Sequence, residues 1–248
     1  MTKKFLRSAL FVGAVLVAMT SCMKNGGNMA TLSLLYATVV ADADARVMVQ
    51  FDANGGYYFA DELLPTDVVD LSVGDRVLLR STTINYDEQP VGANGSQAAP
   101  YKMTAVNFSV MPTEEIMDAV LDPETKNDTL SIMYPPVVAK SDAGNFITVQ
   151  VVTPKNSLPQ MRMVFVKERK ASTSSQQDTL EYELKTIYDR VGDKNQAEVG
   201  FYSFRIMSEP ASQQPLLINY TAKRFFATEY MAATDSTFVL RYPEYKEM

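Results

Sequence analysis

The sequence contains no histidine, and cysteine occurs only once, at position 22. Without histidine the chain cannot form a Ser-His-Asp triad or use an imidazole as general acid or base. Ordinary zinc sites draw on histidine and cysteine, and one cysteine cannot form a disulfide within the chain. We therefore expect no catalytic residue, no metal site and no cofactor. Enzymes that use paired carboxylates, a Ser-Lys pair or a hard cation stay open as classes.

Basic residues are also few, which bears on the kind of partner. A formal charge of −6 becomes −9 once residues 1–21 are removed, because that segment holds three basic and no acidic residues. A surface of this sign repels phosphate backbones, and no basic stripe interrupts it. Nucleic acid is therefore not expected as a partner.

The single cysteine ends a segment with the layout of a bacterial secretion signal. Three basic residues come first, residues 9–18 are apolar, and small polar residues lead to Cys22. The uncharged stretch is shorter than the ~20 residues of a membrane-spanning helix. Met19 fits the cleavage site of a plain secretory signal poorly. We predict a lipoprotein signal peptide over residues 1–21 and a lipid on Cys22.

The residues after the cysteine predict how the protein is held at the membrane. Residues 22–35 are expected to form a lipidated tether, and the diacylated cysteine of a lipoprotein satisfies the two-chain condition for stable anchoring. No acidic run follows Cys22 directly, which favours the periplasm over the cell surface. The predicted location is the cell envelope, anchored to the outer membrane and facing the periplasm.

Short strands separated by turns make up most of the remaining chain. Apolar and polar residues alternate with a period of two, and Gly, Asn, Pro and Ser cluster between the runs. The clearest turn is at residues 52–56, where Asn54-Gly55 joins two apolar runs as in a hairpin. The predicted strands are residues 46–52, 57–59, 76–79, 101–110, 146–152, 161–166, 180–189, 199–207, 216–223 and 238–242.

One helix is predicted, over residues 112–123. Thr113 is suited to the N-cap, two acidic residues follow in the first turn, and Ile116 and Val120 fall at i and i+4. Asp122-Pro123 would end the helix. With almost no other helical period, the many short strands predict a β-sandwich in the second half.

The order of the motifs resembles a known family. Residues 49–59 read V-x-F-D-x-N-G-G-Y-Y-F, residues 71–77 read L-x-V-G-D-R-V, and the late patterns lie at 187–193 and 200–204. With the lipobox cysteine, this order is similar to the NigD-like lipoproteins of Bacteroides-group bacteria. Members often carry a histidine near the aspartate of the first late pattern, where this chain has Tyr188.

The resemblance implies an N-terminal OB-type domain and a C-terminal β-sandwich, and its link to a bacteriocin gene cluster implies an immunity or accessory role. The predicted fold is therefore all-β: an OB-like barrel domain over residues 36–111, a linker helix over 112–123 and an antiparallel β-sandwich domain over 124–248.

Several residues are candidates for binding or modification. Tyr57, Tyr58 and Phe59 could form an aromatic ligand face on the barrel, although at least one of three consecutive strand residues must point inward. The Asp-Ser/Thr triplets at Thr129, Thr179 and Ser236 match the acceptor pattern of Bacteroides-type O-glycosylation.

Two charged residues near the predicted turns have simple explanations. Asp52 begins a segment that resembles the start of a calcium loop, but Gly56 and Leu63 stand where that loop needs its fifth and twelfth ligands. A hairpin turn explains the segment better. Arg76 reads as a solvated arginine at the start of a strand, where an ion pair contributes little stability.

These observations predict a non-catalytic binding or interaction module that recognises an envelope protein or a glycan. The first alternative is a structural subunit of a fimbria or adhesin. The second is a glycan hydrolase, which would need two carboxylates within about 5–10 Å of each other in one cleft.

Overall fold

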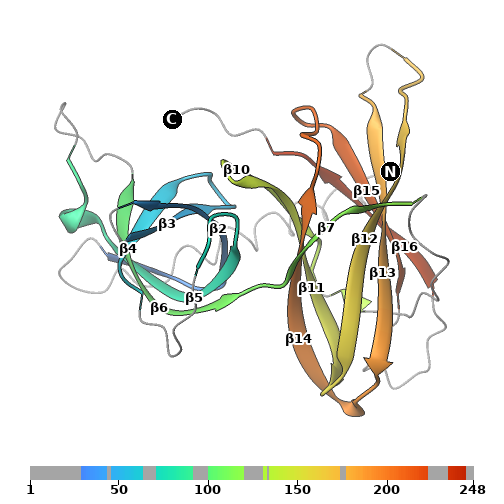
Figure 1. Ribbon diagram of the computed structural model, residues 1–248, viewed down its shortest axis with the longest axis horizontal. Coiled ribbons are helices and arrows are strands. Elements are labelled where there is room, and N and C mark those ends of the chain that lie inside the picture. The colour runs from blue at the N-terminus through green and yellow to red at the C-terminus, as the bar shows by residue number, and fades with distance from the viewer. Residues whose placement is uncertain are drawn as a thin grey trace, which may run out of the picture.

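The computed structural model describes residues 29–43, 46–63, 71–91, 100–119, 131–132, 134–173, 177–222 and 234–243. These residues form sixteen strands and one 3-10 turn, η1 (Tyr86–Glu88), with no α-helix among them. An all-β fold is thus confirmed. Figure 1 shows a closed barrel beside two layered sheets. Within the described residues, no helix is long and apolar enough to cross a membrane.

Five strands close the barrel, in the order β5-β2-β3-β4-β6 and back to β5. The β4–β6 pair is parallel, and the other barrel pairs are antiparallel. A further strand, β1, pairs with the last four residues of β5, beyond the residues of β5 that pair with β2. The strands are β1 (Met29–Leu32), β2 (Leu35–Ala43), β3 (Arg46–Phe51), β4 (Tyr57–Leu63), β5 (Arg76–Asn85) and β6 (Tyr101–Val110).

The barrel encloses its own apolar core, which follows from the period-two alternation of its strands. Val39 of β2, Val49 of β3 and Leu79 of β5 are buried there. The predicted turn at 52–56 is confirmed: the Gly55 N–H donates to the Phe51 carbonyl at 2.8 Å. Gly55 has a φ of 68°, a conformation that glycine adopts without steric cost.

The second part of the chain forms two five-stranded sheets that share one apolar core. One sheet has the order β10-β11-β14-β7, with β9 also on β11, and the other has the order β16-β15-β13-β12-β8. The first consists of β7 (Thr113–Glu115), β9 (Ser131–Ile132), β10 (Val137–Ser141), β11 (Gly144–Lys155) and β14 (Asp193–Ile206). The second consists of β8 (Met117–Asp118), β12 (Leu158–Arg169), β13 (Thr179–Arg190), β15 (Pro215–Ala222) and β16 (Thr234–Arg241).

The core between these sheets draws on both of them. Ile147 and Phe204 come from the first sheet, and Met163, Leu184 and Ile218 come from the second. All five are fully or almost fully buried. Every strand predicted in the second half overlaps a strand of the structure.

The predicted helix over residues 112–123 is wrong where the structure describes it. Thr113–Glu115 is strand β7, parallel to β14, and Met117–Asp118 is strand β8, parallel to β12; residues 120–123 lie outside the described residues. The Ser203 N–H donates to the Pro112 carbonyl at 2.9 Å, and the Ala119 N–H donates to the Phe165 carbonyl at 2.9 Å. Helical propensity contributes only tenths of a kcal/mol per residue, whereas these sheet edges offer unpaired backbone groups.

Candidate functional site

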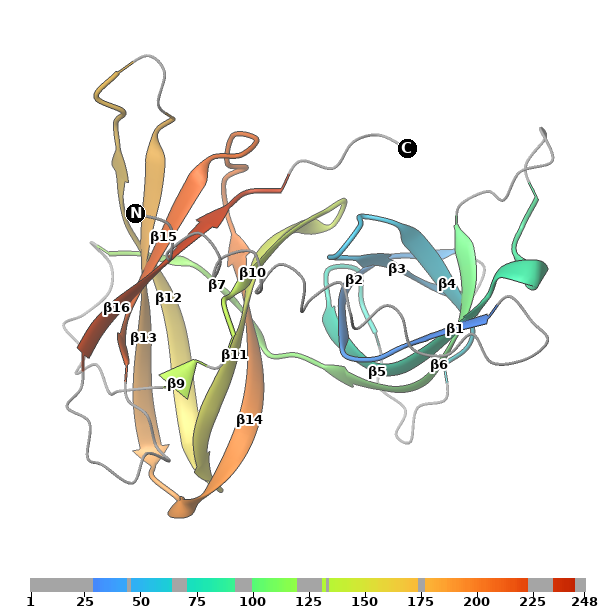
Figure 2. The same ribbon diagram turned by 180° about the vertical axis from the view of Figure 1, so that it is seen from behind.

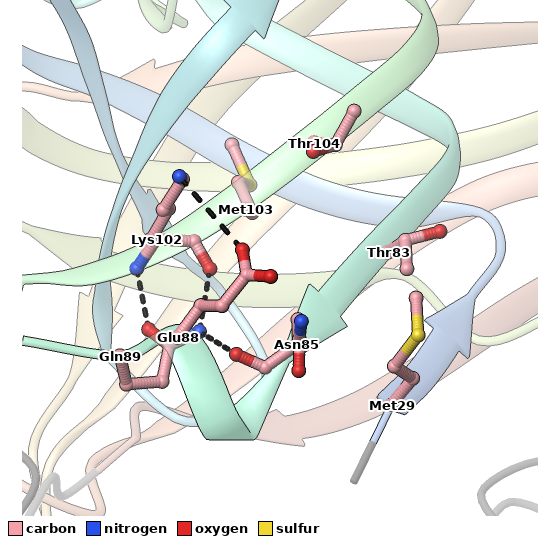
Figure 3. Close-up of a pocket in the computed structure, with 8 residues that line it drawn as sticks. All are labelled: Met29, Thr83, Asn85, Glu88, Gln89, Lys102, Met103 and Thr104. Carbon is pink, nitrogen blue, oxygen red and sulfur yellow. Dashed lines mark hydrogen bonds and ion pairs between the residues drawn. The ribbon is translucent and has the colours of Figure 1, made fainter. Parts of the chain in front are cut away.

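A polar pocket lies at one end of the barrel, between β1, β5, β6 and η1 (Figure 3). Its volume is about 200 Å³. The lining residues are Met29, Thr83, Asn85, Glu88, Gln89, Lys102, Met103 and Thr104. Most of the wall therefore consists of hydroxyl, amide and charged groups, with two methionines beside them.

Gln89 holds the wall of this pocket together. Its side-chain N–H group donates to the carbonyl of Asn85 at 2.6 Å and to the carbonyl of Lys102 at 3.0 Å. Its side-chain oxygen accepts from the Lys102 N–H at 2.6 Å. Asn85 in turn caps η1 by accepting from the Asp87 N–H at 3.1 Å. Because Gln89 is buried and its amide is bonded at both ends, η1 is fixed against the start of β6.

Two opposite charges face this pocket. The Lys102 ammonium lies 4.0 Å from the Glu88 carboxylate, and the Glu88 side chain is mostly exposed. Glu88 is the only acid among the lining residues that the structure describes, so the pocket does not offer a two-carboxylate hydrolase site. The arrangement suits a small polar group that carries both charges.

The sequence did not reveal this pocket. Gln89 lies between the predicted strands over residues 76–79 and 101–110, yet it is buried. Its partners are backbone groups of Asn85 and Lys102, and the latter is thirteen residues away in sequence. No local pattern signals such a contact, because backbone carbonyls carry no residue-specific signature.

The predicted aromatic face does not form one continuous platform. Tyr58 stacks on Phe51 at 4.0 Å between ring centroids and is buried in the barrel core. Its neighbours Tyr57 and Phe59 are only half-buried, and alternation places them on the opposite face of β4. The expectation of a three-residue ligand face is therefore wrong for Tyr58.

Tyr57 contacts the turn between β10 and β11. Its hydroxyl donates to the Asp142 carboxylate at 2.7 Å, and the Asp142 N–H donates to the side-chain oxygen of Gln50 at 2.9 Å. The hydrogen bond to Asp142, with some burial and the nearby negative charge, raises the pKa of the Tyr57 hydroxyl. The turn between β10 and β11 thus rests on this side of the barrel.

Arg76 and Asp52 form a buried ion pair at the junction of the barrel and the sheets. Arg76 is fully buried, and both nitrogens of its fork donate to the two oxygens of Asp52. The same fork donates to the hydroxyls of Thr38 at 2.6 Å and Thr148 at 2.9 Å. The expectation of a solvated Arg76 is therefore wrong. Since Thr148 belongs to β11, this cluster joins the barrel to the first sheet.

An aromatic ring completes that junction. The Phe146 ring lies 5.0 Å from the guanidinium of Arg76 and 5.4 Å from that of Arg205. A cation over an aromatic face is stabilising, more so when it is desolvated. Gly74 packs closely against Arg205, since a Cβ at position 74 would lie 2.5 Å from an Arg205 nitrogen. Arg76 and Asp52 therefore act in joining the two parts of the molecule.

The candidate modification sites lie partly within the described residues. Thr179 begins β13 and Ser236 lies in β16, and both are half-buried. The carboxylate of Asp178 accepts from the Lys170 ammonium at 2.9 Å and from the Ala171 N–H at 2.8 Å. Cys22 and Thr129 lie outside the described residues. Among the described residues, no three carboxylate, imidazole or thiol groups gather as a metal site would require.

Comparison with known proteins shows a shared fold. No protein-family model matches the sequence, and no curated protein is found to be similar to it. A protein of unknown function, DUF1344, from Bacteroides vulgatus is 13% identical with a TM-score of 0.58, over 87% of this chain and 92% of its own. An uncharacterized protein from Parabacteroides merdae is 12% identical with a TM-score of 0.59, over 86% and 98%.

The similar structures also include a NigD-like immunity protein from Bacteroides caccae. It is 12% identical with a TM-score of 0.47, over 89% of this chain and 99% of its own. At these identities the likeness is one of fold.

Proposed function

We propose that this protein is a lipid-anchored component of the cell envelope that binds a partner protein without catalysing a reaction. In this proposal the barrel is an OB-like domain and the two sheets are a β-sandwich domain, with boundaries near residues 111 and 124. The closed five-stranded barrel with one parallel pair supports the first assignment. The core shared by two facing sheets supports the second.

The observation that carries the binding role is a long open strand edge. Strand β14 pairs with β11 along one edge, but on its other edge it pairs only with β7, at Ser203–Arg205. The backbone groups of Ser203 and Arg205 point towards β7, as the hydrogen bonds from the Ser203 N–H and to the Arg205 carbonyl show. Because alternate residues share an edge, the N–H and C=O groups of Val199 and Phe201 point to the same side.

That part of the edge has no strand beside it among the residues that the structure describes. Figure 1 shows β14 at the border of its sheet. Unpaired edge groups are a template for an added strand, and recognition by strand addition needs no dedicated side-chain pocket. The barrel face is less available, because the β10–β11 turn rests on Gln50 and Tyr57.

A photo-crosslinking amino acid in place of Val199 tests this binding role. Val199 is 42% exposed on the open edge, and Val191, which is 51% exposed in the connection between β13 and β14 and belongs to no strand, is the control. In cells, the Val199 variant should form one near-stoichiometric adduct with a different protein, and the Val191 variant should not. A ladder of the protein with itself would instead identify a fibre subunit. No adduct at either position would contradict strand addition at this edge.

The anchor is tested by Cys22→Ala. Without the thiol there is no site for the lipid, so the variant should leave the membrane fraction or keep its signal peptide. Fractionation and mass spectrometry of the whole protein check this outcome. A Cys22→Ala protein with unchanged mature mass and unchanged membrane association would rule the lipid anchor out. Cys22→Ser would be the control for size, and it should behave in the same way.

A further inference from the structure

We propose that the end of the barrel formed by β1, η1 and the pocket of Figure 3 rests on the membrane to which the protein is anchored. The occupant of this surface is a bilayer of zwitterionic phospholipid, whose headgroups meet Glu88 and Lys102 at the pocket. The proposal rests on the lipid anchor at Cys22 proposed above. It adds an orientation and a contact surface that the anchor alone does not specify.

The chain between Cys22 and the barrel is shorter than the predicted tether of residues 22–35, because Met29–Leu32 forms strand β1 and pairs with β5. This short span places this end of the barrel near the bilayer. Strand β1 begins at Met29, seven residues after Cys22. A chain spans at most about 3.3–3.6 Å per residue, so Met29 lies within about 25 Å of the lipidated cysteine whatever the tether's conformation. Met29 pairs with Asn85 and lines the pocket, so the pocket lies within the same reach.

The exposed apolar side chains here suit a lipid surface. Met29 is 53% exposed, and Tyr86, the first residue of η1, is 40% exposed. Tyrosine is favoured where one end of a ring meets apolar chains and its hydroxyl meets water. In Figure 3, Met29 lies beside Asn85, the residue that precedes η1. Because Met29 pairs with Asn85 and Tyr86 follows Asn85 in the chain, the two exposed residues lie at the same end of the barrel.

The charges at this surface favour zwitterionic over anionic lipid. Lys102 and Glu88 lie 4.0 Å apart and offer one partner each to the phosphate and the amine of a zwitterionic headgroup. Asp87 adds a second negative charge in η1. An anionic bilayer would be repelled by this excess of acid and by the formal charge of −9 of the chain from Cys22 onward.

The shape of the molecule agrees with this orientation. The single coiled ribbon, η1, lies on the side of the barrel away from the two sheets in both views (Figures 1 and 2). A barrel that rests on the bilayer by this end holds the sheets away from it. The open edge of β14 is then presented to the surrounding compartment and not to the lipid.

A tryptophan reporter tests the contact directly, because the chain contains no tryptophan of its own. The lipidated protein is purified as Tyr86→Trp and placed in vesicles of phosphatidylethanolamine and phosphatidylcholine that contain brominated lipid. Emission from position 86 should fall about twofold, since a side chain at the headgroup boundary lies close to the bromine atoms. The matched control is Val239→Trp, on the far sheet, whose emission should not change.

Two further measurements distinguish a failure of the lipid anchor from a failure of the proposed docking surface. Sedimentation of the vesicles comes first: if the protein stays in the supernatant, the anchor has failed, and with it the basis of this proposal. If the protein sediments but the Tyr86→Trp reporter is unquenched and fully accessible to aqueous iodide, the anchor holds and the docking surface is overturned. Adding Met29→Glu should reduce the quenching, and replacing the zwitterionic lipid by phosphatidylglycerol should reduce it as well. Stronger quenching in the anionic vesicles would overturn the choice of lipid.

Discussion

Asp52→Asn is expected to lower the free energy of unfolding by about 3–5 kcal/mol. Arg76 is fully buried and both oxygens of Asp52 accept from its fork, so the amide would leave a buried cation without its counter-charge. The same change weakens the junction of barrel and sheets, because Arg76 also donates to Thr148. Urea denaturation followed by circular dichroism measures the loss.

An exposed ion pair provides the control for this prediction. Lys140 and Glu209 lie 2.6 Å apart, with both side chains about half exposed, and such pairs contribute at most about 1 kcal/mol. Glu209→Gln should therefore leave the unfolding midpoint almost unchanged. Replacing both buried partners by apolar residues, as in Asp52→Leu with Arg76→Met, should cost less than Asp52→Asn alone. Equal effects of Asp52→Asn and Glu209→Gln would show that the buried ion pair contributes no more to the free energy of unfolding than the exposed pair does.

Gly192→Ala is expected to destabilise the protein by about 3 kcal/mol or more. A Cβ at Gly192 would lie 2.0 Å from the Lys155 carbonyl oxygen and 2.7 Å from the carbonyl carbon of Asn156. Both contacts are with the backbone of the β11–β12 connection, which cannot rotate away as a side chain can. The Gly192 N–H also donates to the Ser157 hydroxyl at 3.0 Å. An added methyl group would therefore force the β13–β14 connection away from the β11–β12 connection. Thermal unfolding measures the effect.

Gly200 is the control, because it lies in β14, the strand that begins directly after Gly192, and its nearest neighbour is a side chain and not backbone. A Cβ at Gly200 would lie 2.9 Å from the ring of Tyr202, and that ring can move. Gly200→Ala should therefore cost no more than about 1–2 kcal/mol. If Gly200→Ala destabilised the protein as much as Gly192→Ala, the backbone contact would not be the reason for the large effect.

Most of the longer strands and the first hairpin could be predicted from the sequence because their signals are local, whereas β1, β2 and β10 were not predicted. Residues 101–110 were expected as a strand and form β6 with those bounds, since alternation follows directly from the strand's period of two. The predicted turn at 52–56 is present for a similar reason: glycine at position 55 tolerates its positive φ.

The helix failed as a prediction because its signals were local while the competing contacts were not. A suitable cap and two apolar residues at i, i+4 describe a segment in isolation. In the structure, β7 and β8 lie in that segment and pair with β14 and β12 of two different sheets. Those pairings need distant strands as partners, so no feature of residues 112–119 alone predicts them.

The sequence by itself determined most of the longer strands, the hairpin turn at Gly55 and, through its missing histidine, the imidazole chemistry that the chain cannot perform. Each of these follows from residue type and near neighbours. Only the tertiary structure decided that Asp52 pairs with Arg76, that Tyr58 is buried while Tyr57 meets Asp142, and that Gln89 closes a pocket. The first two contacts join residues 24 and 85 positions apart. Such pairs depend on how the barrel closes and on where the sheets pack against it. Neither can be predicted from the spacing of the residues along the chain.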